Sequence, residues 1–212
     1  VIHGGHEHYP LPSPRMVKQY RFYAEVGADA VIGHHTHCFS GYEVYGNTPI
    51  VYGLGNFIFT LNSPMEGWYW GAIAQLNLEK GRPVQLSIIP VEQVRGSFFL
   101  RRPSGENVSN FYGKLDTLSA IIRDDAELVR HWEIYVEKNK KYINAISPLA
   151  YIKNRYVRAI LTRFGLNKIL LTPQYLASLF NRMRCESHRE LFLGLLGQKI
   201  EYYENCNSPK RG

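Results

Sequence analysis

The segments VIHGGHEH at residues 1–8 and AVIGHHTH at residues 30–37 decide the fold class, because each joins a short apolar run to a cluster of histidines. Val1-Ile2 is typical of the end of a buried strand, and Ala30–Ile32 is a second short apolar run. We therefore predict two buried strands, each followed directly by a histidine-rich loop.

A helix is predicted between these two strands. Ser13 is a favoured N-cap and Pro14 suits the first helical position, so the helix should begin there. It should run to about Val26, where Gly27 supplies a left-handed stop. A strand, a helix and a strand within about 32 residues form a βαβ unit, in which the strands are parallel. The fold class is therefore α/β.

Shorter elements are predicted downstream. Extended segments are expected at residues 42–45, 49–52 and 56–60, followed by a hairpin with strands at 70–78 and 84–94 and a four-residue turn at 79–82. After a polar connection at residues 97–110, apolar residues recur at helical spacing near 111–122, 124–146, 148–163, 172–183 and 186–198. We accordingly assign residues 1–96 to an α/β domain, 111–204 to an α-helical extension and 205–212 to a tail.

Composition excludes some classes of protein. Apolar residues make up 45% of the 212, which is enough for a packed core, and no apolar run approaches the roughly 18 residues of a membrane span. The net charge of +7 is uneven: residues 1–100 carry 6 Lys/Arg and 7 Asp/Glu, whereas residues 101–212 carry 19 and 11. Such asymmetry can mark contact with nucleic acid, anionic lipid or an acidic polymer, although interleaved charges on solvated helix faces are the commoner reason.

Six of the eight histidines fall between residues 3 and 37. Ligands in open α/β sheets bind beyond the carboxyl ends of the strands, so the two histidine groups should converge there. Neutral imidazole binds divalent transition metals, and in an extended His-x-His the rings of His35 and His37 point the same way. Histidines that only titrate or pack are the alternative, which remains favoured for His6 and His8 individually. For the group as a whole we predict a metal site.

Three residues beside these histidines have more than one interpretation. Glu7 suits a carboxylate ligand, a group that orients a histidine, or a general base. Asn56 follows a glycine-rich turn and can either offer its amide to a substrate or bond its own backbone. Tyr9 can line a groove, although packing is the commoner role of such an aromatic side chain.

The order of several motifs resembles the bacterial capsule synthesis protein family CapA, also called PGA_cap. The match covers roughly residues 1–95, and its motifs are HGGHE (3–7), VIGHHTH (31–37), YEVY (42–45), PIVY (49–52) and GLGNFIF (53–59). The resemblance implies a role in the synthesis or export of a poly-γ-glutamate capsule.

That family is in turn similar to the calcineurin-like metallophosphoesterases, which implies part of an α/β/β/α sandwich and a two-metal site for Mn, Fe or Zn. Their Gly-His-x-His motif, aligned from its end, makes His35 and His37 ligands and puts His34 in place of the glycine. Aligned from its start, it makes His34 and His37 ligands; we favour the first alignment and keep the second open. A lone-histidine motif maps onto His3. The remaining metal-binding motifs are expected upstream of Val1, so that another segment completes the site.

The candidate site therefore has three groups of residues. The metal ligands are His3, His35 and His37, the candidate catalytic residues are Glu7 and His34, and the candidate substrate contacts are His6, Tyr9 and Asn56.

Two functions suit such a site. The first is a metal-dependent, metallophosphatase-like hydrolase that acts on an anionic polymer or a phosphorylated small substrate, in the bacterial cytoplasm or the cell envelope. The second is a non-catalytic component of a polymer synthesis or export complex. Nucleic-acid binding is disfavoured, because residues 101–212 show neither a helix-turn-helix nor an aromatic RNA motif.

Overall fold

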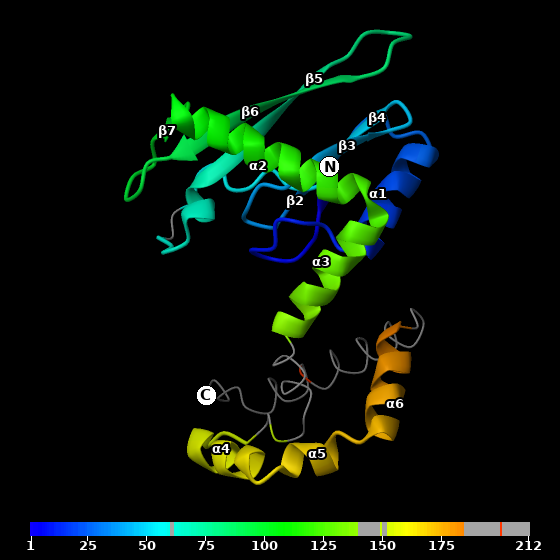
Figure 1. The fold of residues 1–212 in the computed structure, drawn as a ribbon, viewed down its shortest axis with the longest axis vertical. Coiled ribbons are helices and arrows are strands. Elements are labelled where there is room, and N and C mark those ends of the chain that lie inside the picture. The colour runs from blue at the N-terminus through cyan, green and yellow to red at the C-terminus, as the bar shows by residue number, and fades with distance from the viewer. Residues whose placement is uncertain (60–61, 140–148, 150–151, 185–199, 201–212) are drawn as a thin grey trace, which may run out of the picture. The chain divides into compact units, whose positions relative to one another are not determined.

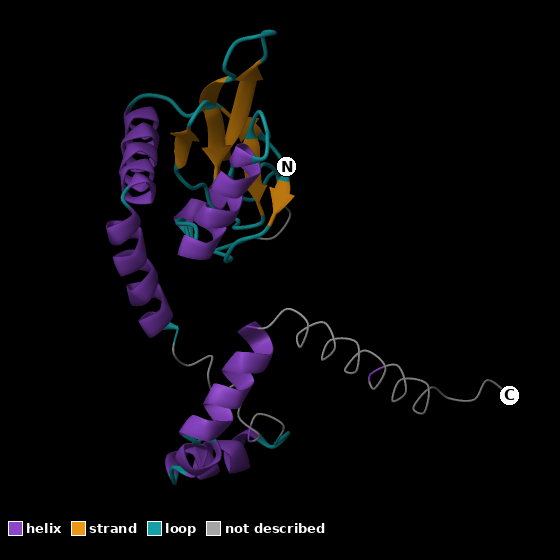
Figure 2. Ribbon diagram, turned by 90° about the vertical axis from the view of Figure 1, so that its right-hand side faces the viewer, coloured by secondary structure: helices purple, strands orange, loops and turns teal. Residues whose placement is uncertain are grey.

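A computed structural model describes residues 1–59, 62–139, 149, 152–184 and 200 of the chain. The chain divides into two compact units, residues 1–138 and residues 139–212 (Figure 1). Every strand of the described part lies in the first unit, and the described part of the second unit is helical (Figure 2). The chain thus combines a mixed α/β part with a helical extension, as the sequence predicted.

The first sheet has the strand order β1 (Ile2–His3), β2 (Val31–His34), β4 (Thr48–Val51) and β3 (Tyr42–Tyr45). The strands β1, β2 and β4 are parallel, and β3 is antiparallel to β4 at the edge. Helix α1 (Pro14–Glu25) joins β1 to β2, so the predicted βαβ unit is confirmed.

Helix α1 begins and ends where its sequence signals lie. The Ser13 hydroxyl accepts a hydrogen bond from the Met16 amide at 3.2 Å, and Gly27 follows the helix with φ +104°. Met16, Val17 and Tyr20 are buried on the face that packs on β2 and β4, and the Tyr20 ring stacks on Tyr52 with the ring centroids 5.4 Å apart. Burial of each large apolar side chain contributes about 1.5–3 kcal/mol, so this face fixes the helix on the sheet.

The second sheet is antiparallel and has the order β5 (Trp70–Asn77), β6 (Gln85–Gln93) and β7 (Leu100–Arg101). The predicted hairpin is confirmed. Its loop is longer than the predicted four-residue turn, because the last pair is Asn77 with Gln85. The 3₁₀ turn η1 (Glu66–Tyr69) leads into β5.

The extended segment predicted at residues 56–60 is wrong for residues 56–59, which form no strand, and Thr60 lies outside the described residues. The backbone here instead passes very close to β5. A Cβ atom at Gly71 would collide with the carbonyl oxygen of Asn56, and an isolated bridge joins Gly55 to Gly71. This contact ties the segment to β5 and directs Asn56 toward the histidines.

Helices α2 (Glu106–Arg123) and α3 (Asp125–Lys138) belong to the first unit. The helix start expected at residue 111 is therefore too late, and α2 begins within the expected polar connection of residues 97–110. Phe111, Leu115, Leu118, Ile122 and Leu128 are buried in one cluster with the apolar side chains of α1 and the first sheet. The two helices therefore pack on the α/β part.

A partly buried ion pair also joins these elements. The Arg21 guanidinium of α1 donates two hydrogen bonds of 2.9 Å to the Glu43 carboxylate of β3 and a third to Asp125 at the start of α3. The Tyr52 hydroxyl donates to the same carboxylate at 2.6 Å, and its burial beside that negative charge raises the pKa of Tyr52.

The second unit contains α4 (Arg155–Arg163), α5 (Leu166–Leu170) and α6 (Pro173–Arg184). The helices α4 and α6 confirm those predicted near 148–163 and 172–183, whereas α5 was not predicted. The helix expected at 186–198 and the tail at 205–212 lie outside the described residues. No helix of the described residues is long and apolar enough to cross a membrane.

Candidate metal centre

The two histidine segments lie side by side at the carboxyl ends of β1 and β2. His3 pairs with His34 in the parallel register, and the Gly4 amide donates to the His34 carbonyl at 3.0 Å. Further along, the His8 amide donates to the Thr36 carbonyl at 2.8 Å. The predicted convergence of the two histidine groups is therefore confirmed.

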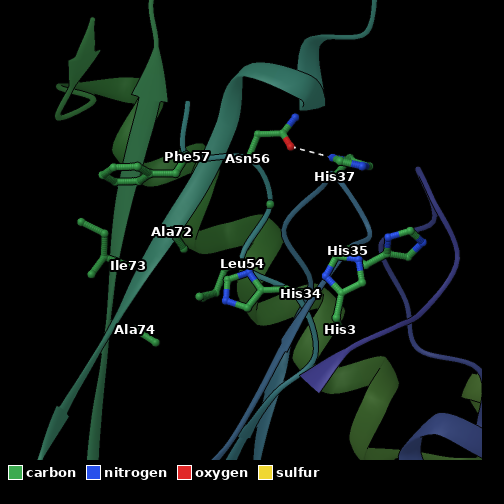
Figure 3. Close-up of a pocket in the computed structure, with 11 residues that line it drawn as sticks. His3, His34, His35, His37, Leu54, Asn56, Phe57, Ala72, Ile73 and Ala74 are labelled. Atoms are coloured by element: carbon green, nitrogen blue, oxygen red, sulfur yellow. Dashed lines mark hydrogen bonds between the residues drawn. The ribbon is translucent and has the colours of Figure 1, made fainter. Parts of the chain in front are cut away.

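These segments form one wall of a cavity of about 470 Å³. His3, His34, His35 and His37 line it on one side (Figure 3). The other side is formed by Leu54, Asn56, Phe57 and the β5 residues 72–74. The cavity is thus imidazole-rich on one side and largely apolar on the other.

Glu7, His35 and His37 are the described residues that could hold a single ion, since one donor atom from each lies within 4.8 Å of the others. The Nε2 atom of His35 is 3.9 Å from a carboxylate oxygen of Glu7. Donor atoms in a tetrahedral zinc site lie about 3.4 Å apart, because zinc–ligand distances are about 2.1 Å. Small side-chain rotations close the difference, and Glu7 has room for them because its side chain is 57% exposed. The donor set fits a divalent ion that accepts nitrogen and oxygen ligands.

His3 and His34 line the cavity but lie outside that donor group. The ring centroids of His3 and His35 are 4.6 Å apart. Burial, together with the nearby charge of His3, lowers the pKa of His34 and favours its neutral form. Of the two alignments considered above, this geometry groups His35 with His37 and not His34 with His37.

Asn56 fixes the orientation and the tautomer of His37. Its side-chain amide nitrogen donates to the Trp68 carbonyl at 2.9 Å, and a carbonyl can only accept, so the Asn56 oxygen must face His37. That oxygen lies 2.9 Å from Nδ1 of His37, which therefore carries the proton (Figure 3). The Nε2 atom keeps its lone pair, as a metal ligand requires.

The His37 ring is also held by two aromatic side chains. It stacks on Trp68 with the centroids 5.3 Å apart, and Phe59 meets its edge at 5.0 Å. These contacts and the Asn56 hydrogen bond position the ring without occupying Nε2.

Three histidines of the two segments have positive φ angles: His8 at +61°, His35 at +101° and His37 at +55°. Such values are uncommon outside glycine, and the value at His35 lies beyond the small left-handed region that other residues tolerate. Strained backbone of this kind persists only where the surroundings impose it, and it concentrates at functional sites. The loops thus hold imidazoles in place at a cost in stability.

The expected substrate contacts have different surroundings. His6 packs on Trp132 of α3 with the centroids 4.9 Å apart, and Tyr9 is buried and stacks on Tyr135 at 4.0 Å. Burial, aided by the nearby charge of His35, lowers the pKa of His6, and burial raises the pKa of Tyr9 to about 12. Neither residue lines the histidine cavity, so these surroundings match the packing alternative.

Residues 1–61 match the family described as bacterial capsule synthesis protein PGA_cap. This part of the chain is therefore similar to the PGA_cap family. Over 98 residues the chain is 33% identical to the capsule biosynthesis protein CapA of Bacillus anthracis, a match that covers 45% of this chain and 23% of that relative. Over 93 residues it is 33% identical to the PGA biosynthesis protein CapA of Bacillus subtilis (strain 168), covering 42% and 23%. The matched part thus spans less than a quarter of either relative.

Residues 1–61, which match the PGA_cap family, contain both histidine segments, Asn56 and the whole first sheet. Two features that position the site lie beyond residue 61: Trp68, which stacks on His37, and the Trp132–Tyr135 pair, which packs on the loop of His6. Sequence reasoning did not find these roles. The glycine-rich turn before Asn56 marked this residue as a candidate in the sequence. Its hydrogen-bond partners, His37 and Trp68, lie 19 and 12 residues away along the chain, so the turn did not identify them.

Proposed function

We propose that this chain supplies the histidine-rich part of a divalent-metal site that hydrolyses phosphoester or acyl bonds in capsular polymer metabolism. The observation that carries the proposal is the convergence of Glu7, His35 and His37 donor atoms within 4.8 Å, from two loops of a PGA_cap region. Other residues of the full-length protein would complete a second metal position. The names of the two Bacillus relatives connect them to capsule and PGA biosynthesis.

Each residue has a part in this proposal. His35 and His37 bind the ion through nitrogen, and Asn56 keeps Nε2 of His37 available by accepting a hydrogen bond from the Nδ1–H group. When bound, a divalent ion supplies an activated water at neutral pH and stabilises developing negative charge. His3 and His34 line the same cavity and face a bound substrate as hydrogen-bonding groups.

The proposal assigns Glu7 to the ion as a carboxylate ligand. Its carboxylate lies near Nε2 of His35, the atom that would face the ion, at 3.9 Å. A general base would instead need to reach a water held beyond the ion. The side chain is exposed enough to move between the two positions, so a substitution separates them. Glu7→Gln keeps an oxygen donor but loses the base, whereas Glu7→Ala loses both.

The apolar wall supports a substrate role for the cavity. Leu54, Phe57 and the β5 residues 72–74 face the imidazoles across the hollow. Such a surface excludes water from one side of a bound substrate, and electrostatic interactions with the imidazoles and an ion are stronger there.

The test uses the full-length protein. Its bound metal is measured by mass spectrometry, and hydrolysis of a phosphodiester and of a γ-glutamyl peptide is followed. We expect a stoichiometric divalent metal and activity toward one of the two substrates, both lost in His35→Ala and His37→Ala. The matched control is His131→Ala, at a histidine of α3 that does not line the cavity.

Two results would contradict the proposal. One is a full-length protein that binds no divalent metal yet keeps its role in capsule formation, which would favour a non-catalytic component of a polymer complex. The other is metal and activity that survive both histidine substitutions, which would place the site elsewhere.

A further inference from the structure

A second hollow lies in the first unit and is lined by residues from the end of β6, from β7 and from the start of α2. Its volume is about 670 Å³, larger than that of the histidine cavity. Turn η1 separates the two: Trp68 contacts His37, whereas Gly67 and Tyr69 line the second hollow. The two cavities share no lining residue.

The floor of this hollow is aromatic and well packed. Phe39, Tyr69 and Phe111 are each less than 9% exposed, and the rings of Phe39 and Phe111 have their centroids 4.4 Å apart. Trp70 stacks beside Phe111 at 6.2 Å. An apolar part of a ligand could therefore rest on buried rings.

The rim carries more positive than negative charge. Arg101 and Glu92 neutralise each other through two hydrogen bonds of 3.0 and 2.9 Å. Arg95 and Lys114 remain, and within the part of the chain that the structure describes neither pairs with a carboxylate. The hollow thus has an excess of two positive charges.

Both cations are held over ring faces. The Arg95 guanidinium lies 4.9 Å from the Tyr69 ring centroid, and the Lys114 ammonium lies 5.2 Å from that of Phe39. Such contacts orient a cation without neutralising its charge, so its N–H groups stay available to an anion. Asn107 and Asn110, from the first turns of α2, add neutral amide donors to the same rim.

The geometry points to a binding site for an organic anion, with a carboxylate or phosphate group between Arg95 and Lys114 and an apolar part on the aromatic floor. Charge complementarity selects the anion, because oxyanions accept charge-assisted hydrogen bonds from Arg and Lys. The aromatic floor selects a ligand that carries an apolar or planar part next to the anion. This site goes beyond the proposed hydrolytic site and does not depend on a metal.

The test follows binding to the chain by amide NMR spectra with three probes. Benzoate carries a carboxylate, phenylphosphonate carries a phosphorus oxyanion whose P–C bond resists hydrolysis, and benzyl alcohol is the neutral analogue. We expect both anions to shift the signals of residues 92–95 and 107–114 saturably, and benzyl alcohol to bind at least tenfold more weakly. Tighter binding of phenylphosphonate identifies a phosphate ligand, and equal or tighter binding of benzoate identifies a carboxylate ligand.

Matched variants assign the binding to this hollow. The double variant Arg95→Gln/Lys114→Gln should weaken anion binding about tenfold or more, because charge-assisted hydrogen bonds are lost. The control Arg82→Gln/Arg102→Gln removes the same net charge from arginines outside the hollow and should stay within about twofold of the unaltered chain. His35→Ala should leave binding unchanged, which separates this site from the proposed metal site.

Three outcomes would overturn the inference. The first is binding that is equal in the two double variants. The second is benzyl alcohol that binds as tightly as the anions. The third is a set of shifted signals that belongs to residues 34–37 instead of the hollow.

Discussion

Replacing His35 with glycine should stabilise the chain relative to replacing it with alanine, which reverses the usual order of these two residues. His35 has φ +101°, a value that glycine adopts freely and that an L side chain resists. Both substitutions remove the imidazole and its contact with His3, so that loss cancels when the two variants are compared. What remains is the backbone preference at this position.

The magnitude follows from two opposing terms. Holding a non-glycine residue in a sparsely populated region costs on the order of 1–3 kcal/mol. Glycine loses about 0.5–1 kcal/mol relative to alanine through the entropy of the unfolded chain. The difference predicts that His35→Gly is more stable than His35→Ala by about 1 kcal/mol.

Urea unfolding of the whole chain measures this difference. With a slope of roughly 2 kcal/mol per molar, a free-energy difference of about 1 kcal/mol moves the midpoint by about 0.5 M. His34 provides the control, because it lies in β2 and has no positive φ. There the alanine variant should be the more stable by about 0.5–1 kcal/mol. If His35→Ala matches or exceeds His35→Gly, the loop is not strained at this residue and the strain argument fails.

Three further outcomes are expected. Asn56→Ala should weaken divalent-metal binding about 10–100-fold, because the His37 imidazole loses the hydrogen bond that orients it. Calorimetric titration measures the metal affinity, and an unchanged affinity would contradict the orienting role of Asn56. Arg21→Met should lower the free energy of unfolding by about 3–5 kcal/mol, because it leaves the buried Glu43 carboxylate without its counter-charge. The control Asp125→Asn should lower it by less than about 1 kcal/mol, because the Asp125 side chain is 76% exposed. The Cys38 thiol should react with iodoacetamide at pH 8 about a hundredfold more slowly than an ordinary thiol. The reason is that burial raises the pKa of Cys38 to about 11, so the thiol stays protonated until the pH approaches that value. Peptide mass spectrometry maps the labelling, and fast labelling of Cys38 in the folded chain would contradict this prediction.

The βαβ unit could be predicted because its signals are local. The N-cap Ser13, the proline after it and Gly27 mark the ends of α1 within the sequence itself, and all three act there as expected. Parallel pairing then places both strand ends at one sheet edge, so the meeting of His3 with the second histidine segment follows from topology.

Features that depend on distant contacts could not be predicted in this way. Residues 56–59 have strand-like composition, but the close approach of Gly71 and the hydrogen bonds of Asn56 take that backbone out of a sheet. The packing of Trp132 on His6 joins residues that no local pattern relates. The need for glycine at position 33 also comes from a distant contact: Gly33 lies within β2, and a Cβ there would be 2.7 Å from the Tyr52 carbonyl oxygen.

The central claim is that imidazoles and a carboxylate from two loops bind one divalent ion, and X-ray absorption at the zinc edge tests it most directly. With one equivalent of Zn²⁺, the chain should show a shell of nitrogen and oxygen ligands at about 2.0–2.1 Å with the multiple-scattering pattern of two imidazoles. The same pattern should be absent in the His35→Ala/His37→Ala double variant. A spectrum without imidazole scattering, or one that the double substitution leaves unchanged, would contradict the account.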